Sequence, residues 1–145
     1  MDPRLEPLGD GEREWIESHL RIARSFVALY TGVEPSEALP TPEALDAAWA
    51  AWLPQWERFD PNHIINAVAM VLGEHLIAAV GLAWCVATDD QGTELAVHGE
   101  PNNVLVFPAN LVGKRFVSRT TGFIAPLLEQ MVLEIRRIRA EEATS

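Results

Sequence analysis

The chain has 145 residues and a formal net charge of −10, from 11 lysines and arginines against 21 aspartates and glutamates. Its 48% hydrophobic and 22% charged residues are typical of one globular domain over residues 1–145, and they exclude a wholly disordered chain. So acidic a chain repels nucleic acids and anionic lipid surfaces, and we therefore expect neither nucleic acid nor a membrane as its partner.

The N-terminal segment has mixed charges and no apolar leader, and the chain has a single cysteine, Cys85. One cysteine cannot form an intramolecular disulfide, so we expect a cytoplasmic protein. Residues 1–10 are expected to form a loose tail, with Asp10 as the N-cap of the first helix. Apolar residues then recur with a period near 3.6 over residues 12–30, which predicts an amphipathic helix that ends at Gly32.

Two further helices are predicted by a capping residue that stands directly before a proline. Thr41 and Asp60 both have this position, which supplies a side-chain acceptor and a residue preset for the first helical turn. The first of these helices is expected to extend to about residue 53, where a proline interrupts it, and the second to about residue 80. Gly81 is the expected terminator of the second helix.

The helix before Gly81 is apolar on almost every side, so we expect it to be the central helix of the core. Its most apolar stretch, residues 64–80, is too short and too polar to span a bilayer unaided, because Glu74 and His75 interrupt the apolar run. The neighbours of Glu74 at helical spacing are all apolar. Either Glu74 is paired or partly exposed, which we favour, or it belongs to a ligand or catalytic site.

The hydrophobic period then changes to that of strands. A tight turn at residues 89–92 separates the first two of three short strands, which makes a hairpin. The predicted strands comprise residues 82–88, 93–98 and 104–107. The stretch 109–118 fits a turn of helix up to Gly113 and then a fourth edge strand. A closing helix begins after Thr120 or Thr121 and extends to about residue 140.

These elements predict an α+β fold with three N-terminal helices, an antiparallel meander of three to four strands and a closing C-terminal helix. Ala83, Cys85 and Ala87 are small and alternate along the first strand of the meander. We expect them to form the face that the helices cover, because small side chains let a helix approach closely.

Trp49, Trp52 and Trp56 form a stripe at i, i+3 and i+7. Large aromatic side chains at this spacing usually fill a core, which is the interpretation we favour. The alternative is a face that binds a partner or holds a homo-oligomer together, because tryptophan is enriched at interface hot spots.

No motif of nucleophilic catalysis, phosphate binding or dinucleotide binding occurs in the chain, and its four histidines lack metal-ligand spacing. We therefore expect no cofactor, no metal and no catalytic residue, and the sequence does not favour an enzyme. Lys114 and Arg115 stand out in a segment without acids. They are either an exposed pair that balances the acidic N-terminal half, which we favour, or an anchor for an acidic partner or an anion.

The central third of the chain resembles a bacterial family of domains of unknown function. The residues that carry this resemblance are Leu72-Gly73-Glu74, Gly81 with Trp84, Asp89 to Glu94, Phe107-Pro108 and Lys114-Arg115. The resemblance implies a bacterial origin and a common fold, and no activity. It also singles out five residues as a binding cluster if they converge in space: Glu74, Trp84, Glu94, Lys114 and Arg115.

Two functional interpretations follow. The first is a non-enzymatic protein-binding module of the adaptor or immunity type, which the small acidic domain and its uneven charge favour. The second is a protein or enzyme that binds a small molecule or an anion in a pocket around Glu74, with Lys114 or Arg115 holding the anion.

Overall fold

The computed structural model describes residues 3–34 and 36–144, which form an α+β fold of helices with one antiparallel sheet at one end. The elements in chain order are β1 (Arg4–Glu6), α1 (Asp10–Thr31), α2 (Pro42–Trp52), the 3-10 helix η1 (Leu53–Arg58), α3 (Pro61–Val80), β2 (Ala83–Asp89), β3 (Gly92–Gly99), β4 (Val104–Val106), α4 (Pro108–Val117) and α5 (Ile124–Thr144). The predicted fold class is confirmed.

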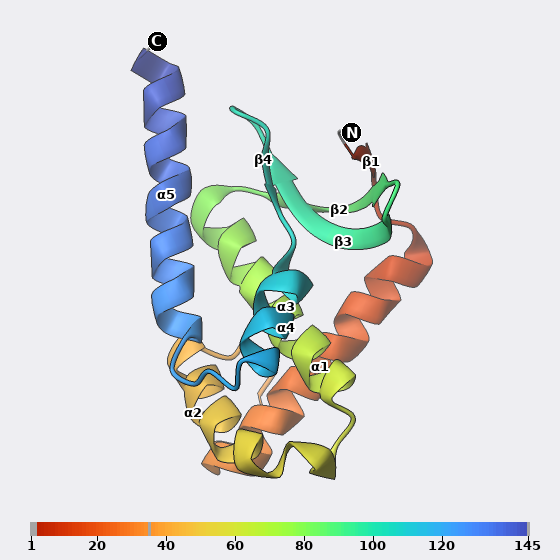
Figure 1. Ribbon diagram of the computed structural model, residues 1–145, viewed down its shortest axis with the longest axis vertical. Helices are drawn as coiled ribbons and strands as arrows, with labels where there is room; N and C mark the ends of the chain where they lie inside the picture. Colours follow the sequence, from red (N-terminus) through yellow and green to blue (C-terminus); the bar gives the residue numbers. More distant parts are fainter. Residues whose placement is uncertain (1–2, 35, 145) are drawn as a thin grey trace.

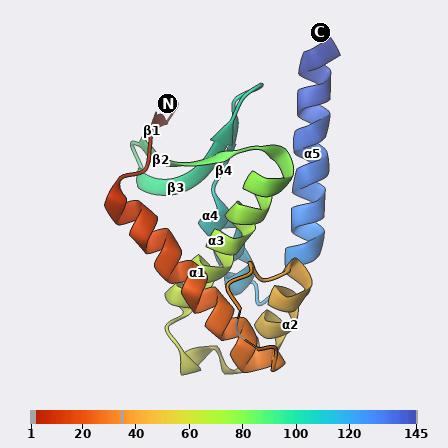
Figure 2. The ribbon, with the colours of Figure 1, turned by 180° about the vertical axis from the view of Figure 1, so that it is seen from behind.

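The sheet has the order β1-β2-β3-β4, with every neighbouring pair antiparallel. Figures 1 and 2 show it across one end of the helices, above the start of α1 and the end of α3. The helix α5 stands along the side of the molecule, and its C-terminal half continues past the sheet.

The helix starts at α2 and α3 are confirmed by their caps. The Thr41 hydroxyl accepts a hydrogen bond from the Ala44 amide at 3.1 Å, and the Asp60 carboxylate accepts one from the Asn62 amide at 3.0 Å. Gly81 ends α3 in the left-handed conformation, as expected. At α1 the prediction was wrong by one position, because Gly9 is the N-cap and Glu12 reaches back to accept its amide at 2.9 Å.

The N-terminal segment is not a loose tail where the structure describes it. Residues 4–6 form β1, and Leu5 lies opposite Ala87 of β2. Leu5 also packs on the cluster of Cys85, Ala87 and Ala96, so apolar burial holds the strand in place. Residues 1 and 2 of the expected tail lie outside the described residues.

The prediction of which face of the sheet the helices cover was also wrong. Trp84 and Val97, which pair across β2 and β3, face the helices and join the helical core, whereas Cys85 and Ala87 point to the opposite face. The small residues on that second face are buried beneath three larger side chains of the sheet region itself: Leu5, Leu105 and Phe107.

The fourth strand of the sheet comes from the N-terminus, and the expected edge strand after Gly113 is absent from residues 108–118. That stretch forms α4, with Pro108 in its first turn. Val112 is fully buried and Phe116 follows four residues later, so a helical stripe faces the core. This stripe outweighs the weak strand signal after Gly113.

The closing helix begins at Ile124, later than Thr120 or Thr121. Its first amides donate to the Asp46 carboxylate of α2, from Ile124 at 2.7 Å and from Ala125 at 2.9 Å. A side chain from a distant segment thus satisfies the open N-terminus of α5, which also holds α2 against α5.

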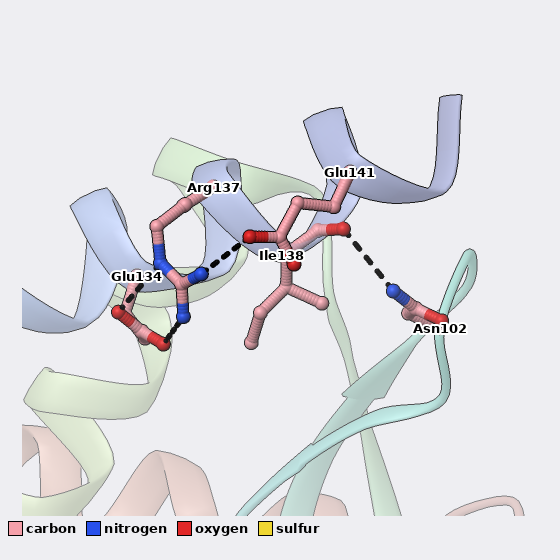
Figure 3. Close-up of polar contacts among 5 residues, drawn as sticks. All are labelled: Asn102, Glu134, Arg137, Ile138 and Glu141. Atoms are coloured by element: carbon pink, nitrogen blue, oxygen red, sulfur yellow. Dashed lines mark hydrogen bonds and ion pairs between the residues drawn. The ribbon is translucent and has the colours of Figure 1, made fainter. Parts of the chain in front are cut away.

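Further along α5, arginine side chains reach the exposed carbonyls at the C-terminus of α3. Arg139 donates to the Val80 carbonyl and Arg136 to that of Ala79. Figure 3 shows that Asn102 of the β3–β4 loop donates to the Ile138 carbonyl at 3.1 Å, while Arg137 on the same helix pairs with Glu134 and Glu141. The loop and the end of α3 together fix the projecting half of α5.

The helix α3 is the centre of the core, as predicted, and packs against α1, α4 and α5. The expectation that this region is too short and too polar to span a bilayer was wrong by length and composition, because Pro61–Val80, alone among the described helices, is long and apolar enough to cross a membrane. A helix buried in the core of a globular protein can have the same length and apolar composition. More than half of its apolar window is buried inside this molecule, which accounts for its hydropathy.

Candidate functional site

The tryptophan stripe is part of the core, which confirms the favoured interpretation. Trp49 and Trp52 are fully buried, and the Trp49 indole N–H donates to the Thr120 carbonyl at 2.9 Å. Trp52 stacks on Phe116 of α4 at a centroid distance of 5.7 Å. Trp49 and Trp52 therefore have no surface to offer a partner, whereas Trp56 is half-buried at the edge of the same cluster.

The basic residues in the last turn of α4 and just after it lie against this aromatic cluster. The Arg119 guanidinium lies 4.3 Å from the centre of the Phe116 ring and 5.2 Å from that of Trp56. Arg115 donates to the Leu111 carbonyl and lies 6.0 Å from the Phe123 ring. These arginines therefore act as cation–π covers of the core, while Lys114 is exposed and makes no side-chain ion pair among the described residues.

Glu74 and Trp84 do converge. The Trp84 indole N–H donates to the Glu74 carboxylate at 2.9 Å, and both side chains are half-buried. The ring of Trp84 rests on Gly73 of α3, where a β-carbon would fall inside contact distance of the indole. Glu74 has no ion pair in the part of the chain that the structure describes. Glu74 is thus half-buried and paired with an indole rather than with an arginine.

Glu94 belongs to a different place on the surface. It is exposed on β3 and accepts a hydrogen bond from the Asn110 side chain of α4 at 3.3 Å. The five residues that the sequence singles out thus make three groups: Glu74 with Trp84, Glu94 with Asn110, and Lys114 beside Arg115. No ion pair joins these groups among the described residues.

An open cleft lies where Glu94 emerges, between α1, α3, α4 and the sheet. It encloses about 590 Å³, which is within the usual range for ligand sites. Met70 of α3 and Leu95 of β3 contribute to its apolar lining, and Trp15 of α1 forms one wall. We call this hollow the α1–β3 cleft.

Trp15 is the exposed aromatic of the α1–β3 cleft. Its side chain is 37% exposed, although it lies one residue before the buried Ile16. The ring rests on His19 at a centroid distance of 3.9 Å, and His19 is fixed by a hydrogen bond to the Trp15 carbonyl at 2.8 Å. The indole is therefore held in position rather than free to rotate over the surface.

The polar groups of the α1–β3 cleft are acidic or neutral. Glu12 and Glu94 are the acidic residues along the cleft, with Glu94 at its sheet edge beside Asn110, and none of the residues that line the cleft is basic. The Asn66 amide also lines the cleft and makes no side-chain hydrogen bond among the described residues. It can therefore donate to and accept from a bound group. This arrangement favours a ligand with apolar and cationic parts over an anion.

Other chemistry finds little support in the described residues. No group of three histidine, cysteine, aspartate or glutamate side chains within residues 3–34 and 36–144 could hold a metal. Burial raises the pKa of the Cys85 thiol, which makes it a weak nucleophile.

Sequence reasoning missed Trp15 and Asn66 as site residues. Trp15 belongs to the apolar period over residues 12–30, and its position at the border of that stripe is the signal that could have singled it out. Asn66 is one amide in a helix that is apolar on almost every side, which gives no local signal of a site. Their joint role depends on how α1 crosses α3, which no local pattern contains.

Comparison with known proteins supports the fold. A crystal structure of a protein from Bacteroides thetaiotaomicron VPI-5482 superposes with a TM-score of 0.64 at 13% sequence identity. The match covers 91% of this chain and 48% of that one, so the present chain spans about half the length of its structural relative. Identity at this level shows a shared fold alone. No curated protein matches the sequence.

The resemblance noted in the central part of the chain is confirmed. The profile of the domain of unknown function DUF3806 matches residues 50–124, which extend from the end of α2 to the start of α5. This segment contains Glu74, Trp84, Glu94, Lys114 and Arg115, together with most of the lining of the α1–β3 cleft. The chain is a member of the DUF3806 family.

Proposed function

We propose that this protein is a non-enzymatic protein-binding module that holds its partner in the α1–β3 cleft. The observation that carries the proposal is the exposed Trp15 side chain, fixed beside an apolar lining and two carboxylates. Tryptophan side chains that bury on association are typical energetic centres of protein interfaces.

The charges of the α1–β3 cleft select the kind of partner. Glu12 and Glu94 supply negative charge on a chain whose net charge is −10. A partner segment with lysine or arginine beside an apolar side chain would satisfy both features. Long-range attraction between acidic and basic surfaces speeds association and disfavours acidic competitors.

The anion-binding alternative has less support. It requires a hollow in which Glu74 meets Lys114 or Arg115, and none of the residues that line the α1–β3 cleft is one of these three. Arg115 is engaged with a carbonyl and an aromatic ring. Lys114 stays available as an anchor for an acidic partner, and the experiment below includes it for that reason.

The proposal is tested by capture of partners from the lysate of the native host, with tagged wild type beside single variants. Trp15→Ala removes the anchor, and Phe59→Ala is its matched control, because Phe59 is also 37% exposed and lies outside the α1–β3 cleft. We expect a partner that wild type and Phe59→Ala retain and that Trp15→Ala and Glu94→Lys lose.

A partner lost with Lys114→Glu and kept with Trp15→Ala would move the binding surface to α4 and refute the assignment of the cleft. No partner retained by wild type under any condition would count against a protein-binding role. Tightening of the specific complex at low salt is also expected, since screening weakens attraction between exposed charges.

A further inference from the structure

We infer that the partner segment binds in an extended conformation and adds to the sheet as a strand along the open edge of β3. This inference rests on the proposed protein-binding function and names the geometry and chemistry of the segment. The strand β3 is longer than its neighbour β4. The strand β3 extends over Gly92–Gly99, whereas β4 pairs only with Val97, His98 and Gly99.

The register shows which groups of β3 face the open edge. Asp89 lies opposite Gly92 across the two-residue turn of the hairpin, so this pair closes the ladder with both of its hydrogen bonds. Alternate residues then point their amide and carbonyl groups to opposite sides. Thr93 and Leu95 accordingly turn these groups away from β2, in the same direction as Val97, which meets Val106 of β4.

No described strand pairs with Thr93 or Leu95 on that side. The chain leaves β4 after Val106 and enters α4 at Pro108, so the ladder stops beside Val97. Thr93 and Leu95 both line the α1–β3 cleft. The unpaired stretch of β3 and the cleft are therefore continuous at these two residues, next to the first turn of α4, from which Asn110 reaches Glu94. A segment laid along this stretch would bring alternate side chains to the cleft.

The sheet register also predicts the sequence of the occupant. The side chain of a residue added opposite Leu95 points to the same side of the sheet as Leu95, toward the helices and Met70. A residue added opposite Glu94 shares the other face and lies beside its carboxylate. The expected segment thus alternates apolar residues with lysine or arginine. Backbone hydrogen bonds supply affinity in this mode, and the alternate side chains supply specificity.

The test uses the whole protein and a synthetic acetylated peptide of alternating valine and arginine, followed by backbone NMR shifts. Thr93→Pro removes the outward amide, while Thr93→Val removes only the hydroxyl and is the matched control. Proline is tolerated on an open strand edge, and circular dichroism verifies the fold of both variants. We expect Thr93→Pro to weaken binding by about tenfold and Thr93→Val to leave it within about twofold.

A second arm varies the peptide, which keeps the inference testable if Thr93→Pro fails to fold. N-methylation of alternate residues in one phase blocks the amides that face β3, and methylation in the other phase does not. We expect the peptide whose methylated amides face β3 to lose binding, and the peptide whose methylated amides face away from β3 to keep it. The same peptide with glutamate in place of arginine should not bind.

Equal binding of both methylated peptides, or of Thr93→Pro and wild type, would overturn strand addition. The cleft assignment would survive that result if Trp15→Ala still abolished binding. Absence of any shift at millimolar peptide would also overturn this inference, and capture of a Trp15-dependent partner from lysate would then stand as a separate result.

Discussion

Gly73 is where a single methyl group has the largest expected effect on stability. The residue lies in α3 directly beneath the indole of Trp84. A β-carbon built at Gly73 would lie 3.2 Å from Cζ3 of the ring and closer still to Cη2 and Cζ2. Carbon atoms in good contact are about 3.5–4.0 Å apart, so in Gly73→Ala the ring must move by about 1 Å.

The indole cannot move without loss, because its N–H donates to Glu74 at 2.9 Å and its backbone belongs to β2. Overpacking of this kind costs about 1–3 kcal/mol, and weakening a hydrogen bond to a charged acceptor costs about 1.5 kcal/mol more. Replacing glycine by alanine inside a helix returns about 1 kcal/mol. We expect Gly73→Ala to lower the free energy of unfolding by about 2 kcal/mol in sum.

The assay is urea denaturation followed by far-ultraviolet circular dichroism, in a cycle with Trp84→Leu. Once the indole is gone, the new methyl group meets no ring, so Gly73→Ala should be neutral or should stabilise by about 1 kcal/mol. The two backgrounds then differ by about 3 kcal/mol, a coupling expected only for residues in contact. An equal effect of Gly73→Ala in both backgrounds would refute the reasoning.

Three further predictions concern stability and reactivity. Asp46→Ala removes the acceptor of two α5 amides and should cost about 2 kcal/mol in urea denaturation, whereas a cost below about 0.5 kcal/mol would show that water replaces it. Because burial raises the pKa of the Cys85 thiol, iodoacetamide should react more slowly with the native than with the unfolded protein. For the same reason, the contribution of Cys85 to the free energy of unfolding should fall as pH rises above the pKa of the unfolded thiol. The ion pair with Arg137 lowers the pKa of the Glu134 carboxyl, so it stabilises the fold above the usual glutamate pKa and loses this effect as pH falls. An NMR titration of Arg137→Gln should find the Glu134 pKa raised, and an unchanged value would exclude the pair in solution.

The helix starts could be predicted where the signal was local. Thr41 and Asp60 cap the helices that begin directly after them, so sequence neighbours contain all the required information. The start of α5 was placed too early because its acceptor, Asp46, belongs to α2. A capping group that comes from a distant part of the chain leaves no trace near the helix it caps.

The covered face of the sheet illustrates a different limit. Each face of β2 carries residues that can be buried. Periodicity therefore identifies the strand but does not show which of its faces meets the helices. The helical face is the one with Trp84 because Gly73 leaves room for the ring. That complementarity joins residues of α3 and β2, and a sequence pattern read along one element does not contain it.

Several of the residues that carried the family resemblance have structural roles that the fold explains. Gly73 and Glu74 seat Trp84, Pro108 begins α4, and Arg115 covers an aromatic ring. These packing residues identify an architecture and carry no chemistry of their own. For this reason the functional surface must be sought among side chains that packing leaves exposed.

Part of that surface lies outside the family match. Residues 50–124 supply the strand edge and the apolar lining, whereas Glu12 and Trp15 come from α1, before the matched segment begins. The matched segment therefore provides a seat for an extended chain, and α1 adds the aromatic wall and one of the charges. If this division is correct, exchanging residues 10–17 for another amphipathic sequence without Trp15 and Glu12 should preserve the fold and remove partner selection. A chimera that folds and still selects the same partner would place recognition entirely on the sheet edge.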